Sequence, residues 1–176
     1  MDNFLELCRS RRSIRKYTRQ PVEQEKIDYL MRCALMSPSG KRINPWEFYV
    51  VKDEAKLRKM SLCRTMGSGM FKTAMAGIVV AVDTSLTELW MCDGAIAAQN
   101  ILLAAEEQGL GACWCQIYGR EADASTGCAN AEEVIRQAVD IPEHLTVLCV
   151  ISLGYKDEER KQYDLEKLLY NKVHNA

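Results

Sequence analysis

Histidine is scarce in this sequence, and with it the side chain on which many catalytic and metal sites depend. His144 and His174 are the only histidines among 176 residues. Eight cysteines occur, but the one close pair, Cys113 and Cys115, has neither a zinc-knuckle nor a thioredoxin spacing. We therefore predict no metal site and no Ser-His-Asp nucleophile, and we expect His144 to lie at the surface of a turn.

Other patterns are missing as well. No Gly-x-Gly-x-x-Gly follows a predicted strand, which argues against a Rossmann dinucleotide site. The net charge of −1 gives no indication of nucleic acid or a membrane as partner, and the apolar stretch 94–105 is shorter than the ~20 residues of a membrane span. No linker or repeat divides the chain, so we predict one domain over residues 1–176. The N-terminus lacks a secretory signal pattern, which predicts a cytoplasmic protein with reduced cysteines.

One stretch, residues 93–116, organises the rest. Between Gly94 and Ala105 the only polar side chains are Gln99 and Asn100, so the pattern predicts a helix that is buried around most of its circumference. Asp93 is a suitable N-cap, and the glycine at position 109 suits a helix end. The many alanines allow neighbouring backbones to approach closely, as in a crowded core or a helix shared between two subunits.

The remaining elements alternate between the two periodicities. Apolar spacing predicts helices at 22–35, 54–62 and 131–139, a short helix near residue 4, and a helical tail at 165–173. Runs rich in β-branched and aromatic residues predict strands at 14–17, 46–52, 77–83, 112–117 and 145–154. This order predicts an α+β or α/β sandwich in which helices cover a sheet.

A basic segment near the N-terminus allows several interpretations. Six of the eleven residues from Arg9 to Arg19 are lysine or arginine, which is compatible with a solvated face or with a nucleic-acid patch. Ser13, Ile14 and Tyr17 interrupt the charges as the buried side of a strand would. A nucleic-acid binder using this patch would lose affinity steeply with salt.

Four motifs together resemble the nitroreductase family of FMN-dependent oxidoreductases. They are the Asp-Gly-Ala-x-Ala-Ala-Gln-Asn helix with its Gly-Leu-Gly-x-Cys-Trp continuation, the Arg-Arg-Ser-x-Arg-x-Tyr segment, the Pro-Ser-Gly loop before Pro-Trp, and the Ile-Ser-Leu-Gly-Tyr strand end. The resemblance spans nearly the whole chain. It implies an α+β, nitroreductase-like three-layer sandwich with a central, mostly antiparallel sheet covered by helices, and an obligate homodimer around a long buried central helix with two FMN sites at its interface.

The resemblance also implies roles for particular residues. Arg11 and Arg12 would hold the FMN phosphate, since arginine forks match a phosphate dianion. Ser13 would bond the phosphate or ribityl chain, and Arg15 would lie at the pyrimidine edge, where a cation stabilises reduced flavin. Further implied contacts are Pro38, Ser39, Gly40 and Asn44 toward the partner's flavin, Trp114, Cys115 and Gln116 with backbone toward flavin N5, and Arg160 and Lys161 at the phosphate.

The implied activity is that of an NAD(P)H-dependent oxidoreductase. The flavin would take a hydride from NADH or NADPH and then reduce a nitroaromatic, a quinone or a similar small acceptor by a ping-pong mechanism, without a catalytic side chain. Two alternatives share the same motifs: a flavin-binding sensor or storage protein without turnover, and a flavin oxidase or dehalogenase. The stretch 62–77, short for the family, leaves the acceptor undefined.

Overall fold

A four-stranded antiparallel sheet is the centre of the molecule. The computed structural model describes residues 4–175, and within them the strands are β1 (Trp46–Val51), β2 (Ala76–Asp83), β3 (Gly111–Gln116) and β4 (Leu145–Gly154), in the order β1-β2-β4-β3. Every pairing between these strands is antiparallel. The two central strands, β2 and β4, are buried along almost their whole length, as their continuous apolar runs predict.

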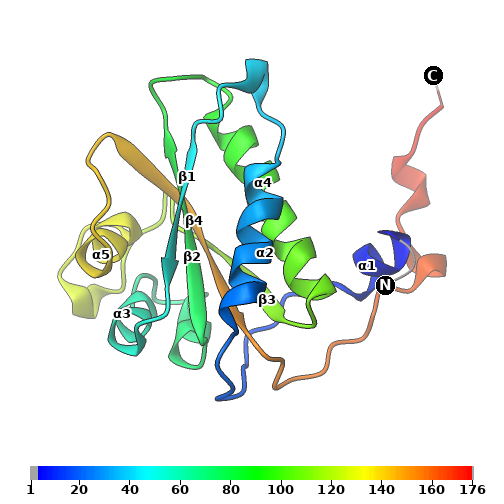
Figure 1. Cartoon of the computed structure of the whole chain (residues 1–176), viewed down its shortest axis with the longest axis horizontal. Coiled ribbons are helices and arrows are strands. Elements are labelled where there is room, and N and C mark those ends of the chain that lie inside the picture. The colour runs from blue at the N-terminus through cyan, green and yellow to red at the C-terminus, as the bar shows by residue number, and fades with distance from the viewer. Residues whose placement is uncertain (1–3, 176) are drawn as a thin grey trace.

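Helices cover both faces of this sheet, which gives the three layers that the motifs predict (Figure 1). The helices within residues 4–175 are α1 (Phe4–Ser10), α2 (Gln24–Leu35), α3 (Glu54–Met60), α4 (Trp90–Glu107) and α5 (Ala131–Ala138). The antiparallel pair α2 and α4 covers one face, and α3 and α5 cover the other. Side chains of β4 fill both interfaces, Val147 and Val150 toward α3 and α5, Ile151 and Leu153 toward α2 and α4.

Helix α4 begins one turn earlier than its sequence suggests. We expected Asp93 to cap it, but the helix starts at Trp90, and Asp93 lies in its first turn. Trp90, Met91 and Cys92 contain no helix breaker and so extend the helix. The Asp93 carboxylate instead accepts a hydrogen bond at 3.0 Å from the Gly40 backbone N–H, which ties the loop after α2 to this end of α4. The predicted C-terminus is confirmed, because Gly109 adopts a φ of +72°.

One stripe of α4 is open in the single chain. Toward α2 and the sheet its residues are buried, as the apolar pattern predicts. Along the opposite stripe, Cys92, Ile96 and Gln99 are exposed and Leu103 is half-buried, and Ile96 retains 40% of its accessible surface. These positions recur at helical spacing. Between Gly94 and Ala105 the exposed residues are confined to this stripe, so the prediction that α4 is buried around most of its circumference is confirmed.

The segment that follows α1 is not the strand predicted at 14–17. It touches the sheet through two isolated bridges, Ser13 to Ala112 and Tyr17 to Lys156. Side chains of Ile14 and Tyr17 lie flat over Gly111 and Gly154, which are register partners on β3 and β4. A Cβ on Gly111 would come within 2.7 Å of Ile14, and one on Gly154 within 2.8 Å of Tyr17. The segment crosses the strand ends, so a continuous ladder cannot form.

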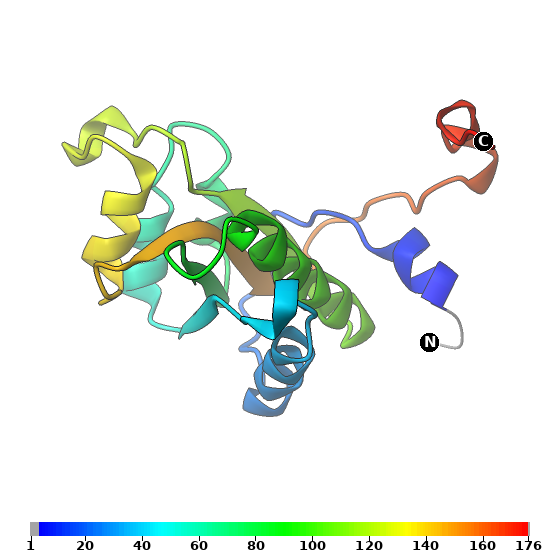
Figure 2. The same cartoon turned by 90° about the horizontal axis from the view of Figure 1, so that it is seen from above.

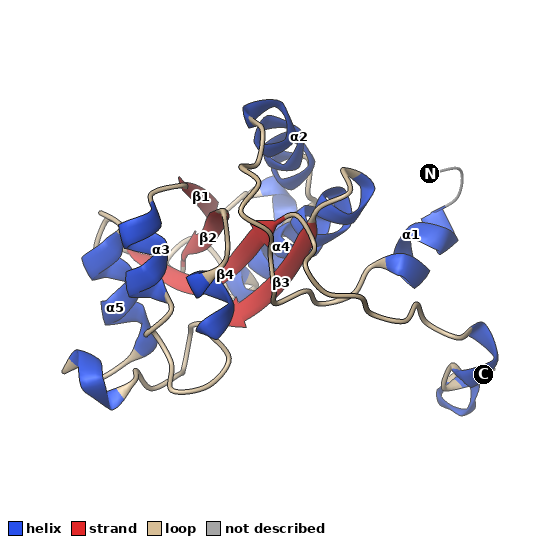
Figure 3. Cartoon of the chain, turned by 90° about the horizontal axis from the view of Figure 1, so that it is seen from below, coloured by secondary structure: helices blue, strands red, loops and turns tan. Residues whose placement is uncertain are grey.

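Both ends of the described chain leave the body together. Figures 2 and 3 show α1 and the C-terminal segment projecting from the same side of the molecule. They are joined by hydrogen bonds between Arg9 and Tyr163, from the Tyr163 backbone N–H to the Arg9 carbonyl at 3.0 Å and from Arg9 Nε to the Tyr163 carbonyl at 3.1 Å. The predicted helix at 165–173 is two short 3₁₀ turns, Leu165–Lys167 and Tyr170–Lys172. A short isolated helix is marginal in water without a surface to pack against.

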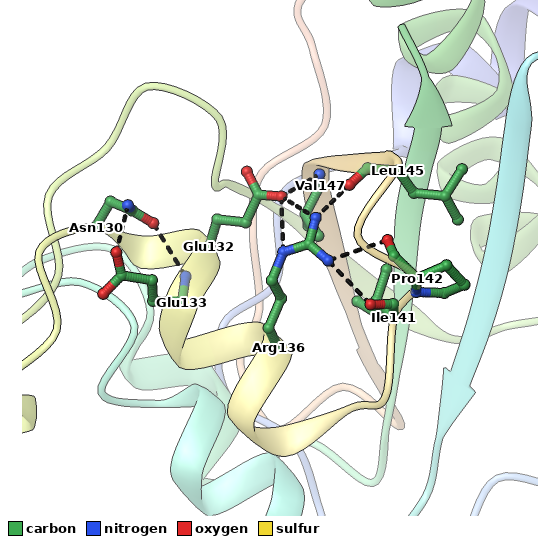
Figure 4. A network of polar contacts seen from close by, with 8 residues as sticks. All are labelled: Asn130, Glu132, Glu133, Arg136, Ile141, Pro142, Leu145 and Val147. Atoms are coloured by element: carbon green, nitrogen blue, oxygen red, sulfur yellow. Dashed lines mark hydrogen bonds and ion pairs between the residues drawn. The ribbon is translucent and has the colours of Figure 1, made fainter. Parts of the chain in front are cut away.

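Helix α5 is anchored to the start of β4 by one arginine (Figure 4). The Arg136 guanidinium donates to Glu132 at 2.6 Å and to the carbonyls of Ile141 and Pro142 at 3.0 and 3.2 Å, and it also reaches the Leu145 carbonyl. Glu132 in turn accepts from the Val147 N–H at 3.1 Å. None of the helices formed by the described residues is long and apolar enough to cross a membrane.

Candidate functional site

The site is built on the open edge of β3. The Ala112 carbonyl accepts from the Ile14 N–H at 3.0 Å, and the Gln116 carbonyl accepts from Arg64 at 3.4 Å, so both point away from β4. In an antiparallel strand the N–H and C=O of one residue point to the same side, and alternate residues share that side. The N–H groups of Trp114 and Gln116 therefore face outward, where a ligand can accept hydrogen bonds from them.

The side chains of β3 fix this edge in place. Trp114 packs into the core beneath α2 and α4, and its indole Nε1 donates to the Gln116 side chain at 3.0 Å. Gln116 donates onward to the Tyr118 carbonyl at 3.0 Å. Cys115 points to the opposite face and is fully buried. The three residues predicted from the motif are thus together on one strand, with only backbone and the half-buried Trp114 and Gln116 accessible.

Buried thiols lie directly behind this edge. A thiol–thiol hydrogen bond with Cys115 lowers the pKa of Cys63, and the same contact together with burial raises the pKa of Cys115. Burial also raises the pKa of Cys113, whose thiol is hydrogen-bonded to the Ser13 side chain. No cysteine of the described chain forms a disulfide. Four are buried, Cys8, Cys33 and Cys128 are half-buried, and Cys92 on α4 is exposed.

Two of the predicted basic residues, Arg12 and Arg160, line one pocket near the start of β3. Arg12 lines an open pocket of about 630 Å³ with Lys156 and Arg160, and Ser10, Ile14, Asp157, Glu158 and Glu159 complete its walls. The Arg12 guanidinium donates to the Lys161 carbonyl and lies 4.6 Å from the centre of the Tyr163 ring. Among residues 4–175, neither Arg11 nor Arg12 has a carboxylate within 4 Å, so their charge is available to an anion. This is the property that a phosphate site requires.

Ser13, Arg15 and the C-terminal basic residues differ in how they are held. Ser13 is half-buried at the bridge to β3, and Arg15 is exposed with its backbone N–H bound to Glu158. Arg160 lines the pocket, but its guanidinium is 2.7 Å from the Glu158 carboxylate. Lys161 contributes its carbonyl to Arg12, while its side chain is exposed.

Two titratable groups hold this segment in place. Partial desolvation raises the pKa of Glu158, but hydrogen bonds from the Arg15 N–H and the Arg160 side chain together outweigh it and bring that pKa below its ordinary value. Burial raises the pKa of Tyr17, whose hydroxyl lies 2.7 Å from the Ser152 hydroxyl and also donates to the Ile14 carbonyl. Tyr17 is thus a neutral anchor between the basic segment and β4.

The loop at 38–44 is internally ordered by side-chain hydrogen bonds. Ser39 Oγ lies 2.7 Å from the Asn44 side-chain oxygen and 2.9 Å from the Asn44 backbone N–H. Gly40 is bound to Asp93, whose second carboxylate oxygen is buried without a partner within the described chain. A Cβ on Gly40 would come within 2.9 Å of Leu89, so the loop lies against the start of α4.

The loop and the basic segment lie at opposite ends of α4 (Figure 1). Asp93 binds the loop at the first turn of the helix, while Glu106 at the last turn pairs with Lys156 at 2.8 Å. Thirteen residues separate the two acids, which corresponds to about 20 Å along a helix that rises 1.5 Å per residue. One chain therefore does not bring Pro38, Ser39, Gly40 and Asn44 to the site formed by Arg12 and β3.

Some residues of the site are not apparent from sequence reasoning. The Gly111–Gly154 pair carries the basic segment, and the Glu106–Lys156 ion pair joins the end of β4 to α4. Arg64 reaches β3 from the connection after α3. Gly111 and Gly154 each lie in one of the sequence motifs, but their pairing as register partners cannot be identified without the sheet.

Known proteins of similar sequence and structure were compared with this chain. A sequence model described as the nitroreductase family matches residues 8–64 and 64–155. A relative from Methanothermobacter thermautotrophicus and one from Archaeoglobus fulgidus, both provisionally named NADH dehydrogenase/NAD(P)H nitroreductase, are 40% and 35% identical. These alignments cover 93% and 94% of this chain and 82% and 92% of the relatives. The solved structure of an FMN-dependent nitroreductase from Clostridium difficile R20291 is similar with a TM-score of 0.92 and 42% identity over 98% of each chain.

Proposed function

The chain belongs to the nitroreductase family, and from that premise we propose that it reduces a small acceptor such as a nitroaromatic or a quinone by a ping-pong mechanism, with two FMN sites in a homodimer. The general reaction class follows from the relatives: the protein is an NAD(P)H-dependent oxidoreductase with FMN as its cofactor. When bound, FMN accepts a hydride from NAD(P)H at N5 and passes two electrons to an acceptor.

The open edge of β3 is the observation that carries the proposal. The outward N–H groups of Trp114 and Gln116 can donate to the flavin ring atoms, and they are fixed because Trp114 is packed into the core. Ser13 is bridged to Ala112, which precedes Trp114 and Gln116 on β3 by two and four residues, so Arg12 and Ser13 would bind the phosphate and ribityl groups beside this edge. Arg15 would place its cation toward the pyrimidine edge.

The dimer is proposed because one chain holds only half of each site. The loop at 38–44 is about 20 Å from the basic segment along α4, so a second copy must supply it if one flavin is to contact both. The open stripe of α4, with Ile96 and Leu103, offers an apolar surface for that copy. Exposed apolar side chains on the projecting ends, including Phe4, Leu169 and Val173, offer another.

Turnover distinguishes the proposal from its alternatives. A storage or sensor protein would bind FMN without oxidising NAD(P)H, and the names of the relatives favour a reductase. An oxidase or dehalogenase of the same fold would make the same contacts to FMN but would act on a different substrate. A location in the cytoplasm, a domain spanning 1–176 and the individual site residues remain predictions.

The test is spectroscopic and kinetic. The purified protein should show flavin bands near ~450 nm that bleach on anaerobic addition of NADH or NADPH and return when p-benzoquinone or nitrofurazone is added. Double-reciprocal plots of the initial rate against NAD(P)H concentration, measured at several acceptor concentrations, should give parallel lines. Intersecting lines would contradict the ping-pong mechanism. A flavin that binds but is not bleached by NAD(P)H would contradict the reductase and favour either the protein without turnover or the oxidase.

The homodimer needs a separate measurement. Sedimentation velocity of the FMN-loaded protein should give twice the chain mass of 20.0 kDa. Arg12→Gln should weaken FMN binding, whereas Arg58→Gln, which removes the same charge from an exposed pair on α3, should leave it unchanged. An FMN-loaded monomer would contradict the shared site.

A further inference from the structure

Arg64 presents a cation at the far end of the same strand edge. It leaves α3 through the turn at 61–68, and its Nη1 donates to the Gln116 carbonyl at 3.4 Å. Gly67, with a φ of +90°, lies directly against the guanidinium: a Cβ there would be 3.4 Å from Nη1 and 3.5 Å from Cζ. Arg64 is thus held by backbone on two sides while its charge remains half-exposed.

This charge has no acidic partner within the described chain. No carboxylate among residues 4–175 lies within 4 Å of Arg64 or of Arg120. Both arginines line an open pocket of about 420 Å³ together with Thr65, Met66, Gly119 and Glu121. Glu121 is the one acid of this lining, so two cations face one anion.

The neighbouring acid is occupied elsewhere. Hydrogen bonds from the Ser125 hydroxyl and backbone N–H, and a further bond from the Thr65 hydroxyl, lower the pKa of Asp123, which stays charged and satisfied in its own turn. Behind the pocket lie the buried thiols of Cys63 and Cys115: the hydrogen bond with Cys63 and burial raise the pKa of Cys115, while the same hydrogen bond and, to a smaller extent, the Arg64 charge lower the pKa of Cys63. The lining of the pocket therefore has two arginines against one carboxylate, and each guanidinium has five N–H donors.

The pocket adjoins the edge of β3 at which the flavin ring is proposed to accept hydrogen bonds. Gln116 supplies an outward N–H to that edge, and its carbonyl is the group that Arg64 binds. A molecule that lies over the flavin ring and extends past Gln116 would thus bring its far end between Arg64 and Arg120. Met66, 79% exposed at the rim, would contact an aromatic body.

We propose that the Arg64–Arg120 pocket binds an anionic group, a carboxylate or a phosphate, of one of the two substrates. This rests on the proposed function, because it assigns the substrate class of that same site. Paired arginines recognise such groups through charge-assisted, bidentate hydrogen bonds. The anion belongs either to the acceptor, as an aromatic carboxylate, or to the donor, as the phosphate next to the nicotinamide riboside.

The binding test needs no turnover. Calorimetric titration of the FMN-loaded protein should show benzoate binding more tightly than benzamide, and inorganic phosphate competing with benzoate. Arg64→Gln and Arg120→Gln should each weaken benzoate binding about tenfold relative to benzamide, the effect of one charge-assisted hydrogen bond. Arg58→Gln, which changes the charge by the same amount outside this pocket, is the matched control. Glu121→Gln should strengthen benzoate binding.

Kinetics then identify the source of the anion. For the acceptor, kcat/KM for 4-nitrobenzoate is compared with that for 4-nitrobenzamide; for the donor, reduced nicotinamide mononucleotide is compared with reduced nicotinamide riboside. Arg64→Gln should lower one of these ratios about tenfold, and the ratio that falls names the substrate. If neither ratio changes and benzoate binding is unaffected in both arginine variants, the proposal is wrong.

The two proposals fail separately. Benzoate binding that depends on Arg64 in a protein that reduces no acceptor would overturn the proposed reductase activity and retain the anion site. Reduction of neutral and charged acceptors with equal loss in every variant would retain the activity and overturn the anion site. Visible absorbance of bound FMN in each variant shows that the site is folded.

Discussion

Replacing Gly111 or Gly154 by alanine should weaken FMN binding without removing any group predicted to touch it. The two glycines are register partners at the ends of β3 and β4, and the basic segment crosses over them. A new Cβ would meet Ile14 Cβ at 2.9 Å in one case and Tyr17 Cβ at 2.8 Å in the other. Both of these atoms are fixed to the backbone, so no rotation of a side chain relieves the contact.

The size of the effect follows from these distances. Ordinary contact with a Cβ begins near 3.4 Å, whereas the fixed Ile14 Cβ would lie 2.9 Å from a Cβ at Gly111, so the segment must move by about 0.5 Å. Overpacking of this kind costs about 1–3 kcal/mol, which is roughly 3–9 °C in Tm for a chain of this length. Arg12 and Ser13 move with the segment. Losing the alignment of one charge-assisted hydrogen bond would weaken FMN binding about tenfold or more.

The assay combines FMN titration of the apoprotein, followed by flavin fluorescence, with thermal melting at saturating FMN. Gly69→Ala is the control, because Gly69 has no atom within 4 Å of the added Cβ and no positive φ. We expect Gly69→Ala to match the wild type in both measurements. Gly111→Ala and Gly154→Ala variants that bind FMN as tightly as Gly69→Ala and melt at the same temperature would refute the idea that this glycine pair positions the basic segment.

Three further expectations rest on other parts of the molecule. Arg136→Met should lower the free energy of unfolding by about 2–4 kcal/mol, because it removes the donor shared by three carbonyls and leaves the mostly buried Glu132 carboxylate with the Val147 N–H but no cation. Arg58→Met, at an exposed pair of the same spacing, should cost less than about 1 kcal/mol; urea denaturation compares the two variants. Glu158 has a lowered pKa in the folded state, so its stabilisation is present above the ordinary glutamate pKa and is lost as pH falls through the lower folded value. Glu158→Gln should therefore reduce the loss of Tm between pH 7 and pH 3, and an unchanged pH profile would contradict this. Ile96→Glu should place a charge on the open stripe of α4, so that sedimentation velocity shows a monomer and FMN titration shows weakened binding. An unchanged dimer would exclude this stripe as the interface.

Local patterns in the sequence were enough to predict the sheet and most helices. Strands β1, β2, β3 and β4 all lie within a residue or so of their predicted ranges, because each is a run of β-branched or apolar residues between clear turn signals. The end of α4 at Gly109 was equally clear. The family motifs supplied a prediction that periodicity does not, namely that the edge at Trp114 and Gln116 and the segment at Arg12 belong to one FMN site.

The errors occur where distant residues decide the local structure. Asp93 was expected to cap its own helix, but it binds Gly40, fifty-three positions away. The segment 14–17 alternates like a strand, yet it lies across a glycine pair whose members are on different strands. The tail at 165–173 has helical spacing but no surface of its own chain to pack against. In each case the residues have the local pattern on which the prediction rested, but a contact with a distant residue, or the lack of one, determined the structure that forms.

The open stripe of α4 and the separated halves of the site have the same physical origin. A helix with apolar residues around most of its circumference needs cover on every side, and a four-stranded sheet with α2 covers only part of it. If the remaining stripe is covered by a second copy, the loop held by Asp93 on one chain can approach the edge of β3 on the other. Cofactor binding and dimerisation would then be linked, so the FMN affinity of dilute protein should fall as the dimer dissociates. An FMN dissociation constant that does not depend on protein concentration, measured across the range in which sedimentation shows dissociation, would contradict this linkage.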